Sequence, residues 1–381
     1  MTVGVDYTAA AWQGAGIGRY TRELIRAAVA LGGPFRYVLF YAAGGLPSDG
    51  SYLRDLRDLC NHYPQVRAVP LPFSPRLLTI IWQRLRLPML AEWFTGPLDL
   101  LHAPDFVLPP TRARTLLTVH DLTFLVHPDR SEPRLQRYLA QVLPHSLRRA
   151  NLVLVDSRAT GDDLVRLLGM PRERLRVVYP GVSEEFRPLP AMATEPVRQR
   201  LGLPERFLLF VGTLEPRKNL PHLLAALPHL PPDTRLVIAG RKGWLYEDIF
   251  ATVARLQLAE QVQFLDFVAD ADLPALYNLA EVFVYPSLYE GFGLPVAEAL
   301  ACGTPTVTTN AGSLPEVAGN AALLVAPATP PNDSRTLAAA IEQARHAAAR
   351  LREAGPLQAR RFPWSQSGRA LLACYLTTLR D

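Results

Sequence analysis

The stretch from Glu281 to Asn310, EVFVYPSLYEGFGLPVAEALACGTPTVTTN, has an apolar run at each end and a helix-length segment between them. The two end runs, EVFVYPS and PTVTTN, are rich in β-branched and aromatic residues, as buried strands are. Gly291, Gly293 and Pro295 lie between the first run and the helical segment, and a proline suits the first turn of a helix. This order predicts two parallel strands joined by a helix.

The same alternation recurs along the whole chain. Further apolar runs lie at 206–213, 235–240, 262–267 and 321–327 in the second half, and at 3–7, 36–41, 66–72, 99–104, 114–121 and 151–157 in the first half. Near-continuous apolar strands separated by helix-length segments predict parallel sheets covered on both faces. The 381 residues also exceed the roughly 250 to 300 at which a single core stops growing. We therefore expect an α/β protein with two doubly wound, Rossmann-like domains in tandem.

A segment with several prolines and no periodic apolar pattern, residues 187–205, separates the two sets of strands. We expect an N-terminal domain over 1–188, a linker over 189–204, a C-terminal domain over 205–362, and a last helix over 363–381 that returns to the first domain. Parallel sheets bind ligands at the carboxyl ends of their strands. The active site is therefore expected in a cleft between the domains.

Composition excludes several classes of protein. Hydrophobic residues make up 49% of the chain and charged residues 20%, which is typical of a globular protein. The chain has no apolar run long enough to span a bilayer and no signal-peptide pattern at its N-terminus, so we expect a cytoplasmic protein. The net charge of +5 fits an anionic small substrate or surface and is too small to indicate nucleic acid. The spacing of Cys60, Cys302 and Cys374 suggests neither disulfides nor a zinc site.

Two glutamates, Glu290 and Glu298, flank the glycine turn of the opening stretch. Gly291 and Gly293 allow a close approach of the backbone to a ligand, and the following helix start offers unpaired N–H groups to an anion such as a phosphate. Glu290 lies in the loop and Glu298 on the helix, so they could hold different hydroxyl-bearing parts of one long ligand. The alternative is a helix-start acid and a solvated helical residue, which leaves the glycines unexplained.

Two adjacent cations, Arg217 and Lys218, follow the strand that ends at Gly212, in VGTLEPRKNLPHLL. Cations at the carboxyl end of a strand, next to the amides of a helix start, can clamp a diphosphate. The alternative is an ordinary basic surface loop.

The first strand is followed by a glycine loop, QGAGIGRYTREL, with Gly14, Gly16 and Gly18. A dinucleotide fingerprint would need glycine where Arg19 stands, and the second strand ends without an acid for a ribose. The pattern thus argues against NAD, although the loop could lie against the phosphates or the sugar of another ligand.

His120 and Asp121 end the strand LLTVHD, where polar side chains can reach a ligand. They could instead form a satisfied structural pair. His102, in LLHAPDF, is placed in the same way.

Asp270 and Asp272 form a D-x-D pair, which can hold a divalent cation and a diphosphate. Both acids directly precede a helix, so capping of that helix explains them more simply, and no metal is expected.

The segment 73–90, FSPRLLTIIWQRLRLPML, mixes Arg76, Arg84 and Arg86 with leucines, isoleucines and Trp82. Such a helix could lie on an anionic membrane surface, but a core helix with a basic outer face has the same pattern. Both alternatives stay open.

Taken together, several motifs resemble those of glycosyltransferase family 4, which has the GT-B fold: GAGIGRYTREL, TVHDLTF, VDSRATGDDL, VVYPGVSEEFRP, GTLEPRKNL, AGRKGW and YEGFGLPVAEALACGTPTVTTNAGSLPEVAG. The resemblance covers nearly the whole chain. It implies that Glu290 touches the donor sugar, that Arg217 and Lys218 clamp the diphosphate, and that His120 lies near the reacting centre. The implied donor-binding residues are Gly16, Gly18, Gly212, Thr213, Arg241, Phe267, Val268, Gly291, Phe292, Gly293, Leu294 and Glu298, the last on the ribose.

One departure from the family pattern is Thr213, where many members have an arginine, so Arg217 and Lys218 would carry more of the phosphate charge. GTLEPRKN together with GW resembles the mannosyltransferase-like branch, which implies GDP-mannose as donor and a role in polysaccharide biosynthesis. The resemblance further implies retention of anomeric configuration without cofactor or metal, and a glycan or lipid-linked acceptor. Contact of residues 73–90 with lipid would place the protein at the cytoplasmic membrane face. The alternatives are a non-catalytic module that binds sugar nucleotides and an NAD-dependent oxidoreductase.

Overall fold

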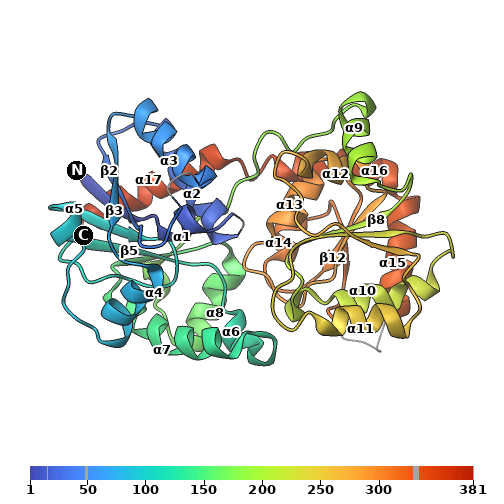
Figure 1. Ribbon diagram of the computed structural model, residues 1–381, viewed down its shortest axis with the longest axis horizontal. Coiled ribbons are helices and arrows are strands. Elements are labelled where there is room, and N and C mark those ends of the chain that lie inside the picture. The colour runs from blue at the N-terminus through green and yellow to red at the C-terminus, as the bar shows by residue number, and fades with distance from the viewer. Residues whose placement is uncertain (15, 48–49, 329–333, 381) are drawn as a thin grey trace. The chain divides into compact units, whose positions relative to one another are not determined.

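The computed structural model describes residues 1–14, 16–47, 50–328 and 334–380 (Figure 1). The chain divides into two compact units. Unit 1 comprises Met1–Leu125, Arg134–Gly181 and the residues from Trp364 onward, and unit 2 comprises Val126–Pro133 and Val182–Pro363. The boundary expected after residue 188 thus lies at 181, and no sequence pattern indicated that residues 126–133 belong with the second unit.

Unit 1 is built on a parallel sheet with the strand order β3-β2-β1-β4-β5-β6-β7. All its strand pairs are parallel, as predicted. Six strands fall on the expected apolar runs, whereas the last was not expected. They are β1 (Thr2–Asp6), β2 (Arg36–Ala42), β3 (Val66–Leu71), β4 (Leu100–Ala103), β5 (Arg114–Val119), β6 (Leu152–Val155) and β7 (Leu175–Val177).

Helices cover both faces of this sheet (Figure 1). They are α1 (Thr8–Trp12), α2 (Ile17–Ala30), α3 (Ser51–His62), α4 (Pro75–Leu78), the π-helix η1 (Thr79–Arg84), α5 (Glu92–Thr95), α6 (Thr123–Val126), α7 (Pro133–Arg149), α8 (Arg158–Leu168) and α17 (Trp364–Arg380). The last helix, α17, packs against α2 and adds Leu371 and Tyr375 to the core of unit 1. The Tyr375 hydroxyl lies 2.9 Å from Nδ1 of the buried His102, so this histidine is a core residue.

Unit 2 is built on a second parallel sheet, with the strand order β10-β9-β8-β11-β12-β13. Its strands are β8 (Leu208–Val211), β9 (Leu236–Ala239), β10 (Val262–Phe264), β11 (Val282–Tyr285), β12 (Thr306–Thr309) and β13 (Leu323–Val325). Its helices are α9 (Ala191–Leu201), α10 (Leu220–Ala226), α11 (Glu247–Arg255), α12 (Leu273–Leu279), α13 (Leu294–Ala301), α14 (Leu314–Ala318), α15 (Ser334–His346) and α16 (Ala348–Ala359). The expected linker therefore contains a helix, α9, which packs against α12.

The opening stretch has the predicted strand–helix–strand form. β11 and β12 pair in parallel with Phe283 opposite Thr306, and α13 connects them. Gly293 begins α13 with φ +95°, a left-handed backbone that favours glycine. Further along, a Cβ on Gly355 of α16 would lie 2.6 Å from the Leu300 carbonyl oxygen, so this glycine lets α16 pack closely on α13. The turn that carries Glu290 is thus held by a well-packed βαβ unit.

Candidate active site

Two loops meet at the carboxyl end of the second sheet because the strands that precede them are neighbours. β8 pairs with β11, with Leu209 opposite Phe283, and the loops after these strands carry the predicted cations and the predicted glutamate. The backbone N–H of Leu288 donates to the Arg217 carbonyl at 2.8 Å, and Oγ of Ser287 lies 3.1 Å from the same oxygen. The sheet and these contacts fix the two loops side by side.

Glu290 lies between the two cations. Its Oε1 accepts hydrogen bonds from Nζ of Lys218 and from the Ser287 hydroxyl, both at 2.6 Å, and its Oε2 accepts from Nη1 of Arg217 at 2.7 Å. Burial raises the pKa of this carboxyl, but Arg217 and Lys218 outweigh burial and hold the pKa at about 2. Glu290 is therefore a carboxylate at neutral pH, and the structure brings together three residues that the sequence placed in one site.

Lys218 is buried, and two oxygen atoms hold its ammonium group in place by hydrogen bonds. Nζ donates to the Tyr285 hydroxyl at 2.7 Å as well as to Glu290. Burial and the neighbouring Arg217 lower the pKa of Lys218, whereas Glu290 and Glu215 counteract them. An ammonium group has three donors, and the described residues take two of them, so one N–H can serve a ligand.

Glu215 was not among the predicted site residues. Its side chain is 3% exposed, and its Oε1 lies 2.8 Å from Nε of Arg217 and 4.0 Å from Nζ of Lys218. The signal was present in the sequence, because Glu215 stands in the same strand-end loop, GTLEPRKN, as the two cations. Four charged side chains, Arg217, Lys218, Glu215 and Glu290, thus form one cluster, called here the clamp.

Glycines and a serine shape the loops around the clamp. A Cβ on Gly312, whose φ is +54°, would lie 2.7 Å from the Glu290 carbonyl oxygen. The Ser313 hydroxyl donates to the Phe292 carbonyl oxygen at 2.7 Å, and its oxygen lies 3.0 Å from the Glu290 carbonyl oxygen. A Cβ on Gly240 would lie 1.8 Å from the Gly212 carbonyl oxygen. These close approaches leave no room for larger residues at Gly312 and Gly240, which the sequence did not single out.

The remaining predicted residues of unit 2 fall into two groups. The Arg241 guanidinium lies 4.2 Å from the centre of the half-exposed Phe267 ring, and Val268 is buried next to it in sequence, whereas Thr213 is exposed. On the glutamate turn, Gly291, Phe292 and Gly293 are buried and Leu294 is half-buried.

Glu298 is buried on α13, where Oε2 accepts a hydrogen bond from the Tyr277 hydroxyl at 3.0 Å. The alternative of a solvated helical Glu298 is therefore wrong.

His120 belongs to unit 1, at the end of β5. Its Nδ1 lies 2.7 Å from Oδ2 of Asp156, and its Nε2 lies 2.8 Å from the Pro104 carbonyl oxygen. Burial lowers the pKa of His120, but Asp156 outweighs burial and raises the pKa to about 9. Both ring nitrogens thus donate, so His120 could bond a substrate only by giving up one of these partners.

The partner of His120 is not the one considered from sequence. Asp121 accepts from the backbone N–H of Thr123 at 2.9 Å, which leaves the pairing to Asp156. Val119 and Val155 are opposite each other in β5 and β6, so the residues that follow them, His120 and Asp156, are neighbours. The strand ends TVHD and LVDS contained this signal, but the order of the strands in the sheet was needed to find it.

The glycine loop of unit 1 is held by Arg22. Its guanidinium donates at 2.7 Å to three backbone carbonyl oxygens, those of Ala10, Gln13 and Gly14. Gly16 has φ +59° and open space around it, whereas a Cβ on Gly18 would lie 2.3 Å from the Gln13 carbonyl oxygen. Gly18 is therefore needed because a side chain would collide with the loop. Gly16 is favoured because its backbone has a positive φ.

The D-x-D pair differs from the expectation. Asp272 stands at the N-cap position of α12, but its side chain makes no capping bond and instead accepts from Arg200 of α9 at 2.5 Å. The expected capping role is wrong for this side chain, because Arg200 provides a charged partner. Within the described ranges, no cluster of three or more histidine, cysteine, aspartate or glutamate side chains could hold a metal ion.

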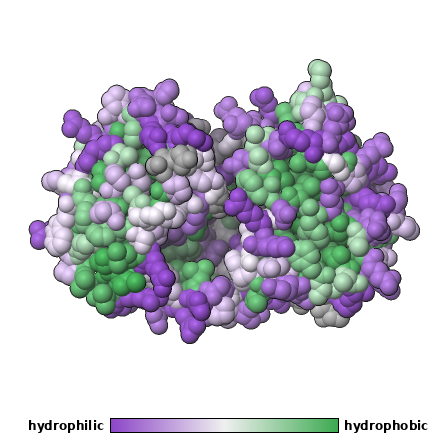
Figure 2. All heavy atoms as spheres, in the orientation of Figure 1, coloured by the Kyte–Doolittle hydropathy of each residue, from purple (hydrophilic) through white to green (hydrophobic). Residues whose placement is uncertain are grey.

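The segment 73–90 forms α4, η1 and an exposed turn from Arg84 to Pro88. Several large apolar side chains of unit 1 are exposed, among them Leu77, Leu85, Leu87, Trp93 and Leu135. Figure 2 shows hydrophobic side chains gathered beside hydrophilic ones on this unit. Burial lowers the pKa of His145 on α7, and the positive charges of Arg149, Arg86 and Arg148 lower it further. None of the helices in the described residues is long and apolar enough to cross a membrane.

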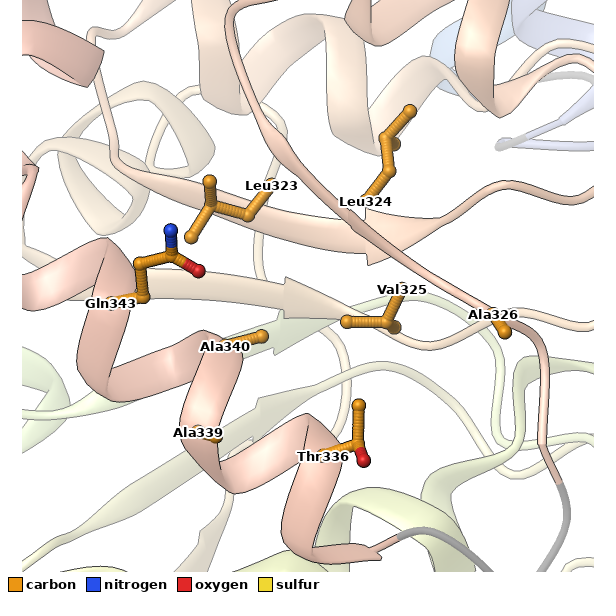
Figure 3. A pocket seen from close by; sticks show the side chains of 8 residues that line it. All are labelled: Leu323, Leu324, Val325, Ala326, Thr336, Ala339, Ala340 and Gln343. Atoms are coloured by element: carbon orange, nitrogen blue, oxygen red, sulfur yellow. The ribbon is translucent and has the colours of Figure 1, made fainter.

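A cavity of 360 Å³ lies elsewhere in unit 2, between the edge strand β13 and α15 (Figure 3). Figure 3 shows Leu323 and Val325 of β13 facing Ala340 and Gln343 of α15. It is lined by no residue of the clamp or of the predicted donor site, so it is separate from the candidate active site.

Comparison with known proteins identifies the family. The model described as glycosyl transferases group 1 matches residues 193–357, and that of glycosyltransferase family 4 matches residues 14–186. The O-antigen chain mannosyltransferase B of Escherichia coli is 36% identical over 275 residues, which are 69% of this chain and 70% of that protein.

Solved structures show the same fold. Sucrose-phosphate synthase from Thermosynechococcus elongatus has a TM-score of 0.77 at 22% identity, and the alignment covers 99% of this chain and 98% of that one. Anabaena HepE in complex with UDP and glucose has a TM-score of 0.72 at 21% identity, and the alignment covers 99% of both chains. The two parallel-sheet units thus form a GT-B fold, and the chain belongs to glycosyltransferase family 4, a family of transferase enzymes.

Proposed function

We propose that the protein transfers a hexose, with mannose from GDP-mannose as the leading candidate, to a glycan or lipid-linked acceptor with retention of configuration. The observation that carries the proposal is the clamp, in which Arg217 and Lys218 converge at the strand ends next to the glutamate turn. The choice of mannose is supported by the 36% identity to a protein named a mannosyltransferase. A place in polysaccharide biosynthesis goes with this choice.

In this proposal, Arg217 and Lys218 bind the diphosphate of the donor. Both cations are held at fixed positions before the ligand arrives, Arg217 by Glu215 and Glu290 and Lys218 by Tyr285 and Glu290. Such preorganised charges stabilise the negative charge that develops on the leaving nucleoside diphosphate. Because Thr213 stands where many relatives have an arginine, these two residues supply the charge at this position.

The glutamates and the neighbouring loops complete the donor site. Glu290 is assigned to the sugar, where its carboxylate faces the positive charge that develops as the glycosidic bond stretches. Glu298 is assigned to the ribose, and reaching it requires the Tyr277 hydroxyl to share this carboxylate. The Arg241 guanidinium, stacked on Phe267, provides a flat surface that suits the base of the nucleotide.

The acceptor proton is assigned to the leaving phosphate rather than to a protein base. His120 is unsuited as a base at neutral pH, since its pKa of about 9 keeps it protonated. We assign it instead to holding the ends of β5 and β6 together.

Transfer is proposed to need no metal, because cations of the protein face the diphosphate. The test is to incubate the protein with GDP-mannose and a lipid-linked or glycan acceptor, and to measure GDP release with and without EDTA. We expect the same rate in both. Activity that is lost in EDTA and restored by Mn²⁺ or Mg²⁺ would contradict the proposal.

The main rival is a sugar-nucleotide module without transferase activity. It would bind GDP-mannose and still release no GDP with any acceptor. Thermal-shift measurements with GDP-, UDP- and ADP-sugars identify the donor first, since a ligand that binds the folded state raises the melting temperature. Release of nucleoside diphosphate from that donor, dependent on acceptor, then separates the enzyme from the module.

Contact with an anionic membrane is proposed through the exposed turn Arg84–Pro88 and the arginines of α7. Leu85 and Leu87 are 61% and 47% exposed, which favours the membrane alternative over the core-helix alternative. Neither segment 73–90 nor 133–149 contains an aspartate or a glutamate, so no negative side chain within them offsets the positive charge of the arginines. A location at the cytoplasmic membrane face goes with this contact and would bring the enzyme to a lipid-linked acceptor.

Vesicle sedimentation tests this contact. The protein should bind vesicles that contain anionic lipid, salt should weaken the binding, and the variant Leu85→Ser/Leu87→Ser should bind less. Equal binding to neutral and anionic vesicles, or none to either, would leave residues 73–90 as a purely structural element.

A further inference from the structure

One charged group of the clamp, Glu215, has only the role of holding Arg217 in the proposed function. Glu215 is almost fully buried, and its Oε1 makes an ion pair with Nε of Arg217 at 2.8 Å. Among the residues that the structure describes, no donor makes an aligned hydrogen bond to this oxygen. A buried carboxylate is costly unless nearby charges compensate it, so the two cations are what keeps Glu215 in place.

The four side chains of the clamp balance one another. Arg217 and Lys218 each carry a positive charge, and Glu215 and Glu290 each carry a negative one, so the empty clamp has no net charge. Each carboxylate contacts both cations within 4.0 Å. Glu290 is assigned to the sugar and pairs with Nη1 of Arg217, whereas Glu215 pairs with Nε of the same guanidinium.

The charge of the clamp matters because donor and product differ in charge. The sugar of a nucleotide sugar occupies one oxygen of the terminal phosphate, and that oxygen gains a negative charge when the sugar leaves. A fixed carboxylate next to the cations therefore disfavours the product more than the donor, and it does so strongly because the site is buried.

We propose that Glu215 is a positioning residue that orients Arg217 through Nε and lowers the affinity of the clamp for the nucleoside diphosphate product, so that the product leaves after transfer. This inference rests on the proposed function, since it takes Arg217 and Lys218 as the partners of the diphosphate. Without the charge of Glu215, the clamp would have a net positive charge and would retain the product.

The variant Glu215→Gln separates this role from a purely structural one. Glutamine has nearly the same shape and keeps an oxygen near Nε of Arg217, but it removes the charge. A structural role predicts weaker binding of donor and product alike. The proposed role instead predicts that the product binds more tightly, which a merely damaged site would not give.

The experiment measures dissociation constants for GDP and GDP-mannose by calorimetry, with UDP and UDP-glucose as the second pair, in the whole protein. For Glu215→Gln we expect product binding to tighten roughly five- to twentyfold and donor binding to change clearly less. GDP should also inhibit transfer more strongly, and kcat should fall while the KM for the donor does not rise. Glu281→Gln is the control, because Glu281 pairs with Arg206 and Arg345 at the other end of β11.

A second variant, Glu215→Asp, keeps the charge and should keep the wild-type ratio of product to donor affinity. The inference is overturned if Glu215→Gln leaves that ratio unchanged, or if Glu215→Asp raises it as much as Glu215→Gln does. Arg217→Ala reports on the proposed function separately. If Arg217→Ala leaves the binding of donor and product intact, the proposed donor site is wrong. If Arg217→Ala loses binding but Glu215→Gln leaves the ratio of product to donor affinity unchanged, only the role of Glu215 is rejected.

Discussion

The two sheets of this protein end in ionisable groups that are used in different ways. At the end of the first sheet, His120 donates one ring N–H to Asp156 and the other to the Pro104 carbonyl, which uses all of its hydrogen-bonding capacity. At the end of the second sheet, Lys218 gives two of its three donors to Tyr285 and Glu290. The same strand-end position thus gives a closed structural pair in unit 1 and a group with capacity for a ligand in unit 2.

The difference also lies in the backbone around each group. In unit 2, Gly212 and Gly293 have positive φ and lie in the loops of the clamp, where the backbone turns in a way that favours glycine. In unit 1, Tyr20 and Phe106 pack edge-on against the His120 ring, with ring centres 4.8 and 5.6 Å away. Aromatic rings thus pack around His120, whereas glycines occur in the loops that carry the clamp.

Removing a clamp cation should have the largest effect on function. Arg217→Ala and Lys218→Ala should each reduce kcat/KM for the donor by roughly 10- to 150-fold, which corresponds to about 1.5 to 3 kcal/mol for a charge-assisted hydrogen bond. Steady-state kinetics with varied donor measure this. Arg206→Ala is the control, since Arg206 forms an exposed pair with Glu281. Unchanged kinetics in both clamp variants would remove the clamp from the site.

The histidine pair of unit 1 should affect stability and its pH dependence. Asp156 raises the pKa of His120 from 6.5 to about 9, although burial opposes it. A raised pKa in the folded state gives stability that is complete below pH 6.5 and is lost as the pH rises through 9. The melting temperature of wild type minus that of His120→Gln should therefore shrink by several degrees over this interval, an amount of stability on the order of 2 kcal/mol.

Because the melting temperature of His120→Gln is subtracted from that of wild type, the contributions of other groups that titrate between pH 6.5 and 9 cancel. A difference that stays constant between these pH values would show that His120 is not held as an imidazolium. Turnover at neutral pH should change less in His120→Gln than in either clamp variant, because His120 is assigned to structure. A larger loss of turnover than of stability would return His120 to the reacting centre.

A smaller effect, on the free energy of unfolding, is expected when a glycine with positive φ is replaced by alanine, and its size should depend on the atoms around the glycine. Gly312 and Gly169 both have positive φ, but only Gly312 is close to another group, the Glu290 carbonyl oxygen. Gly169→Ala should cost about 1 kcal/mol of unfolding free energy for the backbone alone, and Gly312→Ala should cost about 1 kcal/mol more for the contact. Urea unfolding measures both. Equal costs would mean that the Glu290 loop can shift to accept a methyl group.

Much of this architecture could be predicted from the sequence because apolar strands and glycine turns are local patterns. The parallel sheets and the three residues Arg217, Lys218 and Glu290 follow from runs and motifs only a few residues long. β7 was missed because Leu175–Val177 is too short to give a pattern. The helix α9 was missed because Pro188, Pro190, Pro196 and Pro204 suggested a linker, although Pro196 lies inside the helix.

Contacts that depend on the order of strands could not be predicted. Asp156 was not assigned to His120 because their pairing follows from the neighbouring positions of β5 and β6. The role of Asp272 depended on Arg200, which lies far away in the sequence on α9. Glu215 could have been noticed beside Arg217, but its burial, which makes its charge matter, appears only in the folded chain.

The most direct test of the account compares the two glutamates of the opening stretch. In the proposed site, the clamp cations hold the diphosphate, Glu290 acts on the sugar and Glu298 on the ribose. Calorimetric titration with GDP and turnover at saturating GDP-mannose are measured for Glu290→Gln and Glu298→Gln. Glu290→Gln should bind GDP at least as tightly as wild type while kcat falls, and Glu298→Gln should lose GDP affinity. A Glu290→Gln variant that loses GDP affinity and keeps its turnover would contradict the account.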